Sequence, residues 1–235
     1  MKKIIFFMMA VSFTGCAEMQ QVLAQLPQTQ GVIGADVSHG LKEALHNGIT
    51  KQVSKLTVID GFYKNEAVKI LLPEELRKVD ASLRKIGLSS LADEGLKVLN
   101  RAAEDAVKEA TPIFVDAVRN MSFTDATSIL MGNENSATTY LQSSTSTALY
   151  GKFNPVIRNS LSKVGADKVW ENIITKYNSI PLIRKVNPDL NDYVTNQAMN
   201  GVFKMVALEE KDIRTNLSAR TSVLLQRVFA MQDKR

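Results

Sequence analysis

Apolar residues recur at helical spacing from Asp36 almost to the end of the chain, and this pattern constrains the fold more than any other feature. In the first such segment, four apolar positions share one helical face: Leu41, Leu45, Ile49 and Val53. Later segments repeat such stripes between glycines and prolines, which break helices. The best candidate for a strand, residues 180–186, is bordered by prolines. The sequence therefore predicts a single all-α domain over residues 36–230, with about ten helices around one core.

Glycine, proline and small polar residues predict where the helices begin and end. Pro112 and Pro188 are expected at the first position of their helices, the second of which Asn187 would cap. Pro155 is expected to kink or restart a helix, because it removes a backbone hydrogen bond. Residues 133–147, rich in Ser, Thr and Asn, are expected to hold only a short helix. Further helix starts are predicted at Ser89 or Ser90, Ser122, Thr145 and Ser218.

The segment 187–214 predicts the longest helix of the domain. Its apolar residues surround much of the helix circumference: Leu190, Tyr193, Val194, Ala198, Val202, Met205, Val206, Leu208 and Ile213. A helix that is apolar on so many sides is expected at the centre of the fold. Gly201 in its middle costs about 1 kcal/mol relative to alanine. We therefore expect this glycine to permit a close crossing with another helix.

The first 16 residues are typical of a secretory signal peptide. Lys2 and Lys3 precede an apolar run that is too short to span a bilayer, which needs roughly 20 apolar residues. A buried N-terminal helix is the alternative. Residues 13–16 (Phe-Thr-Gly-Cys) resemble the lipobox of bacterial lipoproteins, which ends in the lipidated cysteine. Phe13 stands where an aliphatic residue is usual, so ordinary signal-peptidase cleavage and a soluble periplasmic protein remain the alternative.

Cys16 is the only cysteine of the chain, which excludes an internal disulfide. Its acylation would explain a lone cysteine in an exported protein, and the two chains of a lipoprotein cysteine suffice for stable anchoring. By the same resemblance, Ala17 predicts sorting to the outer membrane, with the protein facing the periplasm. Residues 17–35 contain five glutamines and predict a tether, which could include a short helix at 18–26.

Charge and residue spacing exclude several classes of partner. Loss of Lys2 and Lys3 with the signal peptide would lower the net charge from +5 to +3, too small and dispersed for nucleic-acid binding. His39 and His46 are the only histidines and lie seven positions apart, whereas a helical metal pair needs four. The glycines form no phosphate-binding loop. We therefore expect neither a metal nor a cofactor.

Five charged residues form the candidate site: Arg101, Glu104, Glu209, Glu210 and Arg214. Glu210 and Arg214 lie four positions apart, a spacing at which side chains on one helix meet. The favoured interpretation is a surface ion pair, which contributes at most about 1 kcal/mol. The alternative is a semi-buried cluster of carboxylates and guanidinium groups that fixes the central helix. A catalytic pair of carboxylates is a third and more distant interpretation.

Seven sets of residues resemble one known family: Ala67-Val68-Lys69-Ile70 with Leu72-Pro73; Asn100-Arg101-Ala102-Ala103-Glu104; Pro112-Ile113-Phe114; Asp125-Ala126 with Ile129-Leu130; Ala137-Thr138 with Tyr140; Asn187-Pro188-Asp189-Leu190 with Tyr193-Val194-Thr195; and Glu209-Glu210 with Ile213-Arg214. Together they resemble the bacterial domain-of-unknown-function family 4197, over residues 36–229. The resemblance implies an uncharacterised exported helical protein. It brings no activity, cofactor or catalytic residue.

Three functions follow from these observations. The first is a non-enzymatic scaffold or interaction module of the envelope, attached to the membrane through Cys16 and bound to an unidentified envelope protein. The second is a carrier of a lipid or other apolar ligand, in a cavity lined by methionines such as Met199 and Met205. The third is a hydrolase that uses carboxylates such as Glu209 and Glu210.

Overall fold

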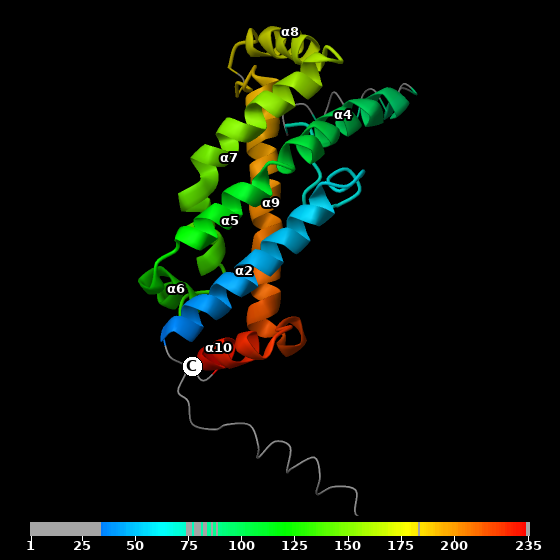
Figure 1. Cartoon of the computed structure of the whole chain (residues 1–235). Coiled ribbons are helices and arrows are strands. Elements are labelled where there is room, and N and C mark those ends of the chain that lie inside the picture. The colour runs from blue at the N-terminus through cyan, green and yellow to red at the C-terminus, as the bar shows by residue number, and fades with distance from the viewer. Residues whose placement is uncertain are drawn as a thin grey trace, which may run out of the picture. The chain divides into compact units, whose positions relative to one another are not determined.

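The computed structural model of the chain describes residues 34–73, 89–182 and 184–233, with isolated positions between 77 and 87. The predicted signal peptide, Cys16 and nearly all of the tether lie outside the described residues. The sequence also predicts a helix that Pro73 opens and Gly87 ends, and most of its residues lie outside them too. The described residues form eight α-helices and one short 3₁₀ helix, without a strand (Figure 1). The prediction of an all-α fold is confirmed, with eight described helices in place of about ten.

The helices share one compact unit, which begins at Gly34. In chain order they are α2 (Gly34–Leu56), α4 (Ser89–Val107), α5 (Ala110–Asn120), α6 (Phe123–Leu130), α7 (Ser136–Ser162), α8 (Ala166–Asn178), α9 (Leu190–Thr215), the 3₁₀ helix η2 (Leu217–Ala219) and α10 (Val223–Asp233). In the part of the chain that is described, no helix is both long and apolar enough to cross a membrane. The buried apolar side chains run from Val37 to Phe229, so this unit holds its own core.

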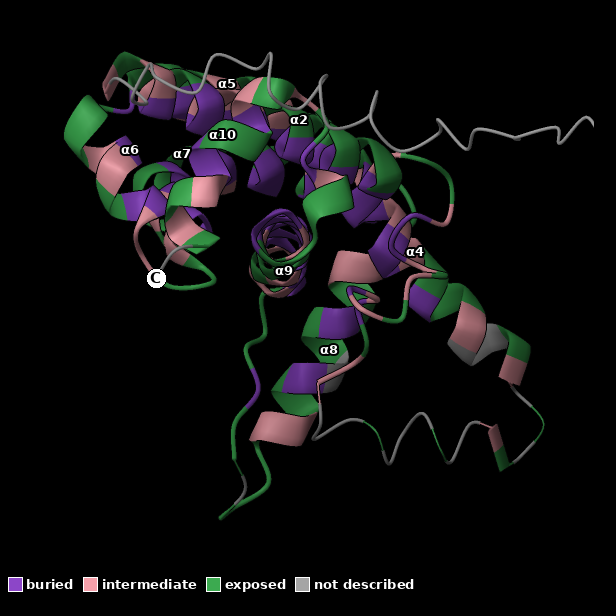
Figure 2. Ribbon diagram, turned by 90° about the horizontal axis from the view of Figure 1, so that it is seen from below, coloured by how far each residue is buried: buried purple, intermediate pink, exposed green. Residues whose placement is uncertain are grey.

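The central helix of the unit is α9, as its apolar circumference predicts. α2, α4 and α7 pack along it, and α8 contacts it near its start. Figure 2, which looks along α9, shows its buried residues enclosed by the other helices. The helix has 26 residues and is therefore about 39 Å long, at 1.5 Å per residue. It is one residue shorter than α7, so the prediction that it is the longest helix is wrong. Leu208, which the sequence placed on the buried stripe, is 48% exposed.

The two ends of α9 carry different parts of the chain (Figure 1). α8 and the loop that follows it lie at the start of α9, whereas η2 and α10 follow its end. The first half of α2 also lies at the second of these ends. There a Cβ on Gly40 would contact Val228 of α10, and one on Gly48 would contact Glu209 near the end of α9. The chain therefore enters the helical unit at the end opposite α8.

The Ser/Thr-rich segment is helical from Ser136 onward, and the prediction of only a short helix there is wrong. It belongs to α7, which continues through Pro155 without restarting. Hydroxyl groups in this segment donate to backbone carbonyls one turn back, as Thr145 Oγ1 does to Leu141 O at 2.6 Å. The hydroxyl groups of these side chains therefore find their hydrogen-bond acceptors within the helix. Thr145 is a buried interior residue and caps nothing.

Several predicted helix starts shift by a few residues. Asp189, not Asn187, caps α9, because its carboxylate accepts the backbone N–H groups of the next turn. Pro112 lies two residues inside α5, which starts at Ala110. Ser218 belongs to η2, and α10 starts four residues later than predicted. Ser122 does cap α6, in a capping box with Asp125. Residues 180–182 and 184–186 form a loop and not a strand.

Candidate functional site

The five charged residues predicted as one site lie in three places. Arg101 and Glu104 contact each other on α4. Glu210 and Arg214 contact each other near the end of α9. The fifth residue, Glu209, instead contacts Lys51 and Gln52 of α2. Each place has its own backbone partners, described in turn below.

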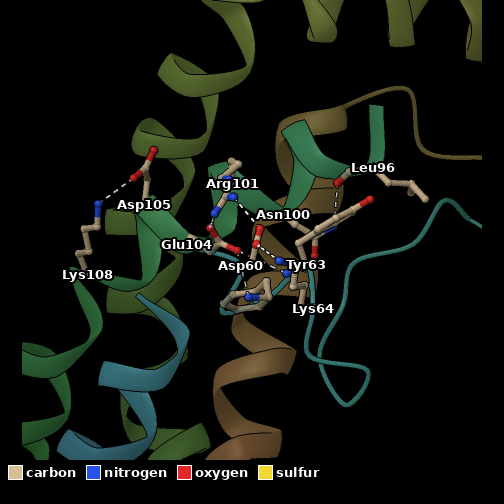
Figure 3. Close-up of polar contacts among 10 residues, drawn as sticks. Asp60, Tyr63, Lys64, Leu96, Asn100, Arg101, Glu104, Asp105 and Lys108 are labelled. Carbon is tan, nitrogen blue, oxygen red and sulfur yellow. Dashed lines mark hydrogen bonds and ion pairs between the residues drawn. The ribbon is translucent and has the colours of Figure 1, made fainter. Parts of the chain in front are cut away.

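One turn of α4 holds the loop between α2 and Pro73, and we call Asn100, Arg101 and Glu104 the loop clamp (Figure 3). Asn100 is fully buried. Its side chain accepts the backbone N–H of Ile70 at 2.8 Å and donates to the carbonyl of Ile70 at 2.9 Å. It also donates to the carbonyl of Leu96 at 2.7 Å. The amide group thus holds one residue of the loop through both of its backbone groups.

The carboxylate of Glu104 holds the other half of the loop. Its Oε1 accepts the backbone N–H groups of Phe62 at 3.1 Å and Tyr63 at 3.4 Å. Arg101 donates to its Oε2 at 2.5 Å and to Asp60 Oδ1 at 2.6 Å. Glu104 is 3% exposed, so these partners compensate the cost of burying its charge. Its Oε1 binds the loop directly, and its Oε2 reaches the loop through Arg101, which also binds Asp60.

Asp60 completes this network at a bend in the loop. Its backbone lies in the left-handed region, with a φ of 68°. A hydrogen bond from Lys64 lowers the pKa of Asp60 below its ordinary value, and the charges of Lys64 and Arg101 act in the same direction. The ionised form of Asp60 is therefore the form that the folded loop favours.

Glu210 and Arg214, the helix-end cluster, connect the end of α9 to three other helices. The Glu210 carboxylate accepts the backbone N–H groups of Ala137 at 2.9 Å and Thr138 at 2.8 Å, at the start of α7. Arg214 donates to the carbonyls of Ile129 and Leu130 at the end of α6, and to Gln232 of α10. A negative charge at the start of a helix and a positive charge at its end are both favourable, because they oppose the helix dipole.

The helix-end cluster is buried, with Glu210 7% and Arg214 4% exposed. The favoured interpretation of a surface ion pair is therefore wrong, because both groups lie inside the packed unit. The separation of the five residues also matters for catalysis. Both oxygens of Glu210 accept hydrogen bonds from α7 or Arg214, and Glu209 is paired with Lys51 at 2.6 Å. The two carboxylates thus contact different partners and do not face a shared site.

Glu209 lies beside a cavity of about 320 Å³ between α2, η2 and the end of α9. Gln52 donates to its Oε2, while Gln52 Oε1 is buried and has no hydrogen-bond partner among the described residues. Asn100, Asp60 and Gln52 are polar partners that the sequence did not single out. Only Asn100 lay within a segment that carried a family resemblance.

The histidines do not form a metal site. His39 and His46 are both exposed and line a shallow pocket of about 410 Å³ with Arg119. Across the described ranges, no group of three or more His, Cys, Asp and Glu side chains could hold a metal ion. Two surface grooves, of about 610 and 520 Å³, run along α7, and charged residues line both. Met199 and Met205, suggested for a ligand cavity, are buried on α9.

The α8 end of the unit carries a different kind of surface. α8 packs inward through Trp170 and Ile174, and the Trp170 ring stacks on Tyr193 of α9 with centroids 5.9 Å apart. Four aliphatic side chains at this end are exposed, among exposed polar residues such as Lys168 and Glu171. The four are Val164, Val169, Ile180 and Leu182.

A model of the family described as "Protein of unknown function (DUF4197)" matches residues 32–230. The chain belongs to the DUF4197 family. The loop clamp, the helix-end cluster and the α8 end all lie within the matched residues, so this DUF4197 protein presents each of them as part of the family domain. No match was found among curated proteins or among solved structures.

Proposed function

We propose that this DUF4197 protein is a non-enzymatic interaction module of the bacterial envelope, anchored by a lipid on Cys16 and making contact through its α8 end. The observation that carries the proposal is the group of exposed aliphatic side chains in and beside α8. Exposed apolar side chains that lie close together, as Ile180 and Leu182 do in the loop after α8, are typical of interaction sites. The alternative proposals, a ligand carrier and a hydrolase, have no comparable support.

The use of the buried charges favours a non-enzymatic role. Glu104 and Glu210 each accept backbone N–H groups from a segment distant in sequence. Both carboxylates are buried and hydrogen-bonded within the fold, so they stabilise it and are not exposed to a substrate. The path of the chain agrees, because the tether would join α2 at the end of α9 opposite α8. The α8 end is then at the end of α9 opposite Gly34, the first described residue of the unit.

The anchor is tested by acyl labelling and membrane fractionation of the full chain and of Cys16→Ser. We expect the wild-type chain to incorporate the labelled acyl chain and to sediment with membranes. Cys16→Ser should do neither. A substituted chain that is still labelled and still sediments would contradict the lipid anchor.

The contact surface is tested by photo-crosslinking in cells from a matched pair of exposed valines. Val169 is on α8 and Val223 is at the start of α10, with similar exposure. A photoreactive residue at 169 should give a crosslinked product, lipid or protein, that the same residue at 223 does not give. Equal products from both positions would contradict a specific role for the α8 end.

A further inference from the structure

The loop after α8 is closed at its neck by a side-chain clamp. Asn178 Oδ1 accepts the backbone N–H of Val186 at 2.9 Å, and Asn178 Nδ2 donates to the carbonyl of Val186 at 2.8 Å. Trp170 Nε1 donates to the next carbonyl, that of Asn187, at 3.3 Å. We call residues 179–182 with 184–185 the tip. The neck is therefore fixed to α8, and the tip extends from it.

The tip presents aliphatic side chains outward. Ile180 is half exposed and Leu182 is fully exposed, with Pro181 between them also exposed. Leu182 has a φ of 62°, in the left-handed region that disfavours residues with a Cβ. A leucine gains nothing from this position within the folded unit, since its side chain is in solvent and its backbone is strained. The position is consistent with a side chain that is buried by something outside the chain.

Cationic and aromatic residues surround the aliphatic tip. Residues 176–187 contain Lys176, Arg184 and Lys185 and no acidic residue. All three cations are exposed. Tyr177, at the base of the tip, is partly exposed. Aliphatic groups at the apex, with tyrosine and cations behind them, match the order of hydrocarbon, interface and charged headgroups in an anionic membrane.

We propose that the tip inserts into the surface of an anionic lipid bilayer, with Ile180 and Leu182 entering the headgroup region and the three cations binding lipid phosphates. The inference rests on the proposed role of the α8 end as the contact surface, and it identifies an anionic lipid bilayer as what that surface contacts. An acidic protein would attract the cations but gives no reason for exposed aliphatic side chains at the apex of a fixed neck. A bilayer accommodates that shape without a complementary pocket.

The experiment measures vesicle co-sedimentation of the chain from Ala17 onward, which carries no acyl group. Cooperative urea unfolding first establishes that each variant is folded. The vesicles are phosphatidylcholine alone, and an equimolar mixture of phosphatidylcholine with phosphatidylglycerol. We expect binding to the mixed vesicles only, and its loss in roughly 1 M salt, where charges are screened beyond about 3 Å.

Leu182→Asp tests the tip, and Leu217→Asp is its matched control. Leu217 is another exposed leucine, on η2 at the opposite end of α9. Leu182→Asp should weaken binding by about tenfold or more. The substitution removes the leucine side chain that would be buried in the bilayer and adds a negative charge that the anionic lipids repel. Leu217→Asp should leave binding unchanged.

Two results would overturn the lipid inference: no binding to the mixed vesicles, or binding that Leu182→Asp leaves unchanged. Failure of the lipid inference is distinguishable from failure of the proposed function. If vesicles do not bind but position 169 crosslinks to a protein that position 223 does not reach, the α8 end remains the contact surface with an acidic protein as its partner. If position 169 gives no specific product, the proposed function itself fails.

Discussion

Individual buried charges in this chain hold backbone segments in place. Glu104 binds the loop after α2, Glu210 binds the start of α7, and Arg214 binds the end of α6. Each side chain binds backbone groups that take no part in the regular hydrogen bonds inside a helix. A buried N–H or carbonyl without such a partner costs about 1–3 kcal/mol.

Substitution of Glu104 tests this role. Glu104→Ala leaves the backbone N–H groups of Phe62 and Tyr63 without their acceptor and Arg101 without one partner. We expect the free energy of unfolding to fall by about 3 kcal/mol. Asp105→Ala, its exposed neighbour paired only with Lys108 in the described contacts, should change stability by about 0.5 kcal/mol or less. Urea titrations of both variants measure the difference, and equal losses would contradict the clamp.

Sequence spacing finds contacts within a helix and misses contacts between a helix and a loop. The pairs Arg101–Glu104 and Glu210–Arg214 follow from separations of three and four residues. Their burial does not follow, because it depends on which helices pack around them. Asp60 could not be assigned to the same site, since its partner Arg101 is 41 residues away and no pattern links them.

Among the helices, α9 shows why a predicted glycine contact had a different partner. Gly201 was expected at a helix crossing. A Cβ built there would lie 2.7 Å from Cε1 of Phe62, a fully buried ring in the loop after α2. The glycine therefore makes room for a side chain that the loop clamp holds against α9.

Gly201→Ala should consequently destabilise the protein. Alanine improves helix propensity by about 1 kcal/mol, but the buried Phe62 ring has no free space to move into, and overpacking costs about 1–3 kcal/mol. We expect a net loss of about 1–2 kcal/mol. Gly151→Ala is the control, because an added Cβ in this exposed position of α7 contacts nothing within 4 Å. It should raise stability by about 0.5–1 kcal/mol, and a loss there would mean that propensity arguments fail for this unit.

Helix type was easier to predict than helix boundaries. Apolar periodicity identified α2 and α9, and Ser122 predicted the start of α6. The start of α9 was misplaced because both Asn187 and Asp189 are capping residues, and only the geometry shows that Asp189 accepts the N–H groups of Asn191 and Asp192. The sequence predicted α7 as separate pieces because a run of Ser and Thr is typical of a loop. In the structure their hydroxyl groups donate hydrogen bonds within the helix.

For the molecule as a whole, the carboxylates predict sensitivity to acid. Hydrogen bonds from Lys64, Ser122 and Arg220 lower the pKa values of Asp60, Asp125 and Asp233 respectively. A lowered folded pKa contributes stability that is present above the unfolded value of about 4. That contribution is lost as the pH falls through the folded value. Thermal unfolding should therefore move to lower temperature between about pH 5 and pH 2.

Asp60→Asn separates one contribution from the rest. Asparagine tolerates the left-handed backbone at this position, so the substitution removes the charge with little change in strain. The variant should be less stable than the wild type at pH 7, and the difference should shrink as the pH falls through the lowered pKa of Asp60 and its carboxyl group becomes protonated. Calorimetric scans across this range measure it, and a difference independent of pH would show that the charge of Asp60 contributes nothing.

The closed neck at Asn178 also makes the tip a place where the polypeptide can be lengthened. The side chain of Asn178 binds the backbone of Val186 and so holds the two ends of the loop together. Residues added to the loop between these two positions need not disturb α8 or α9. A peptide epitope or a fluorophore-binding sequence could be grafted beside Leu182 and leave the helical unit intact. The same two hydrogen bonds would carry the graft at a fixed distance from the core, so the protein could serve as a scaffold for displaying foreign loops.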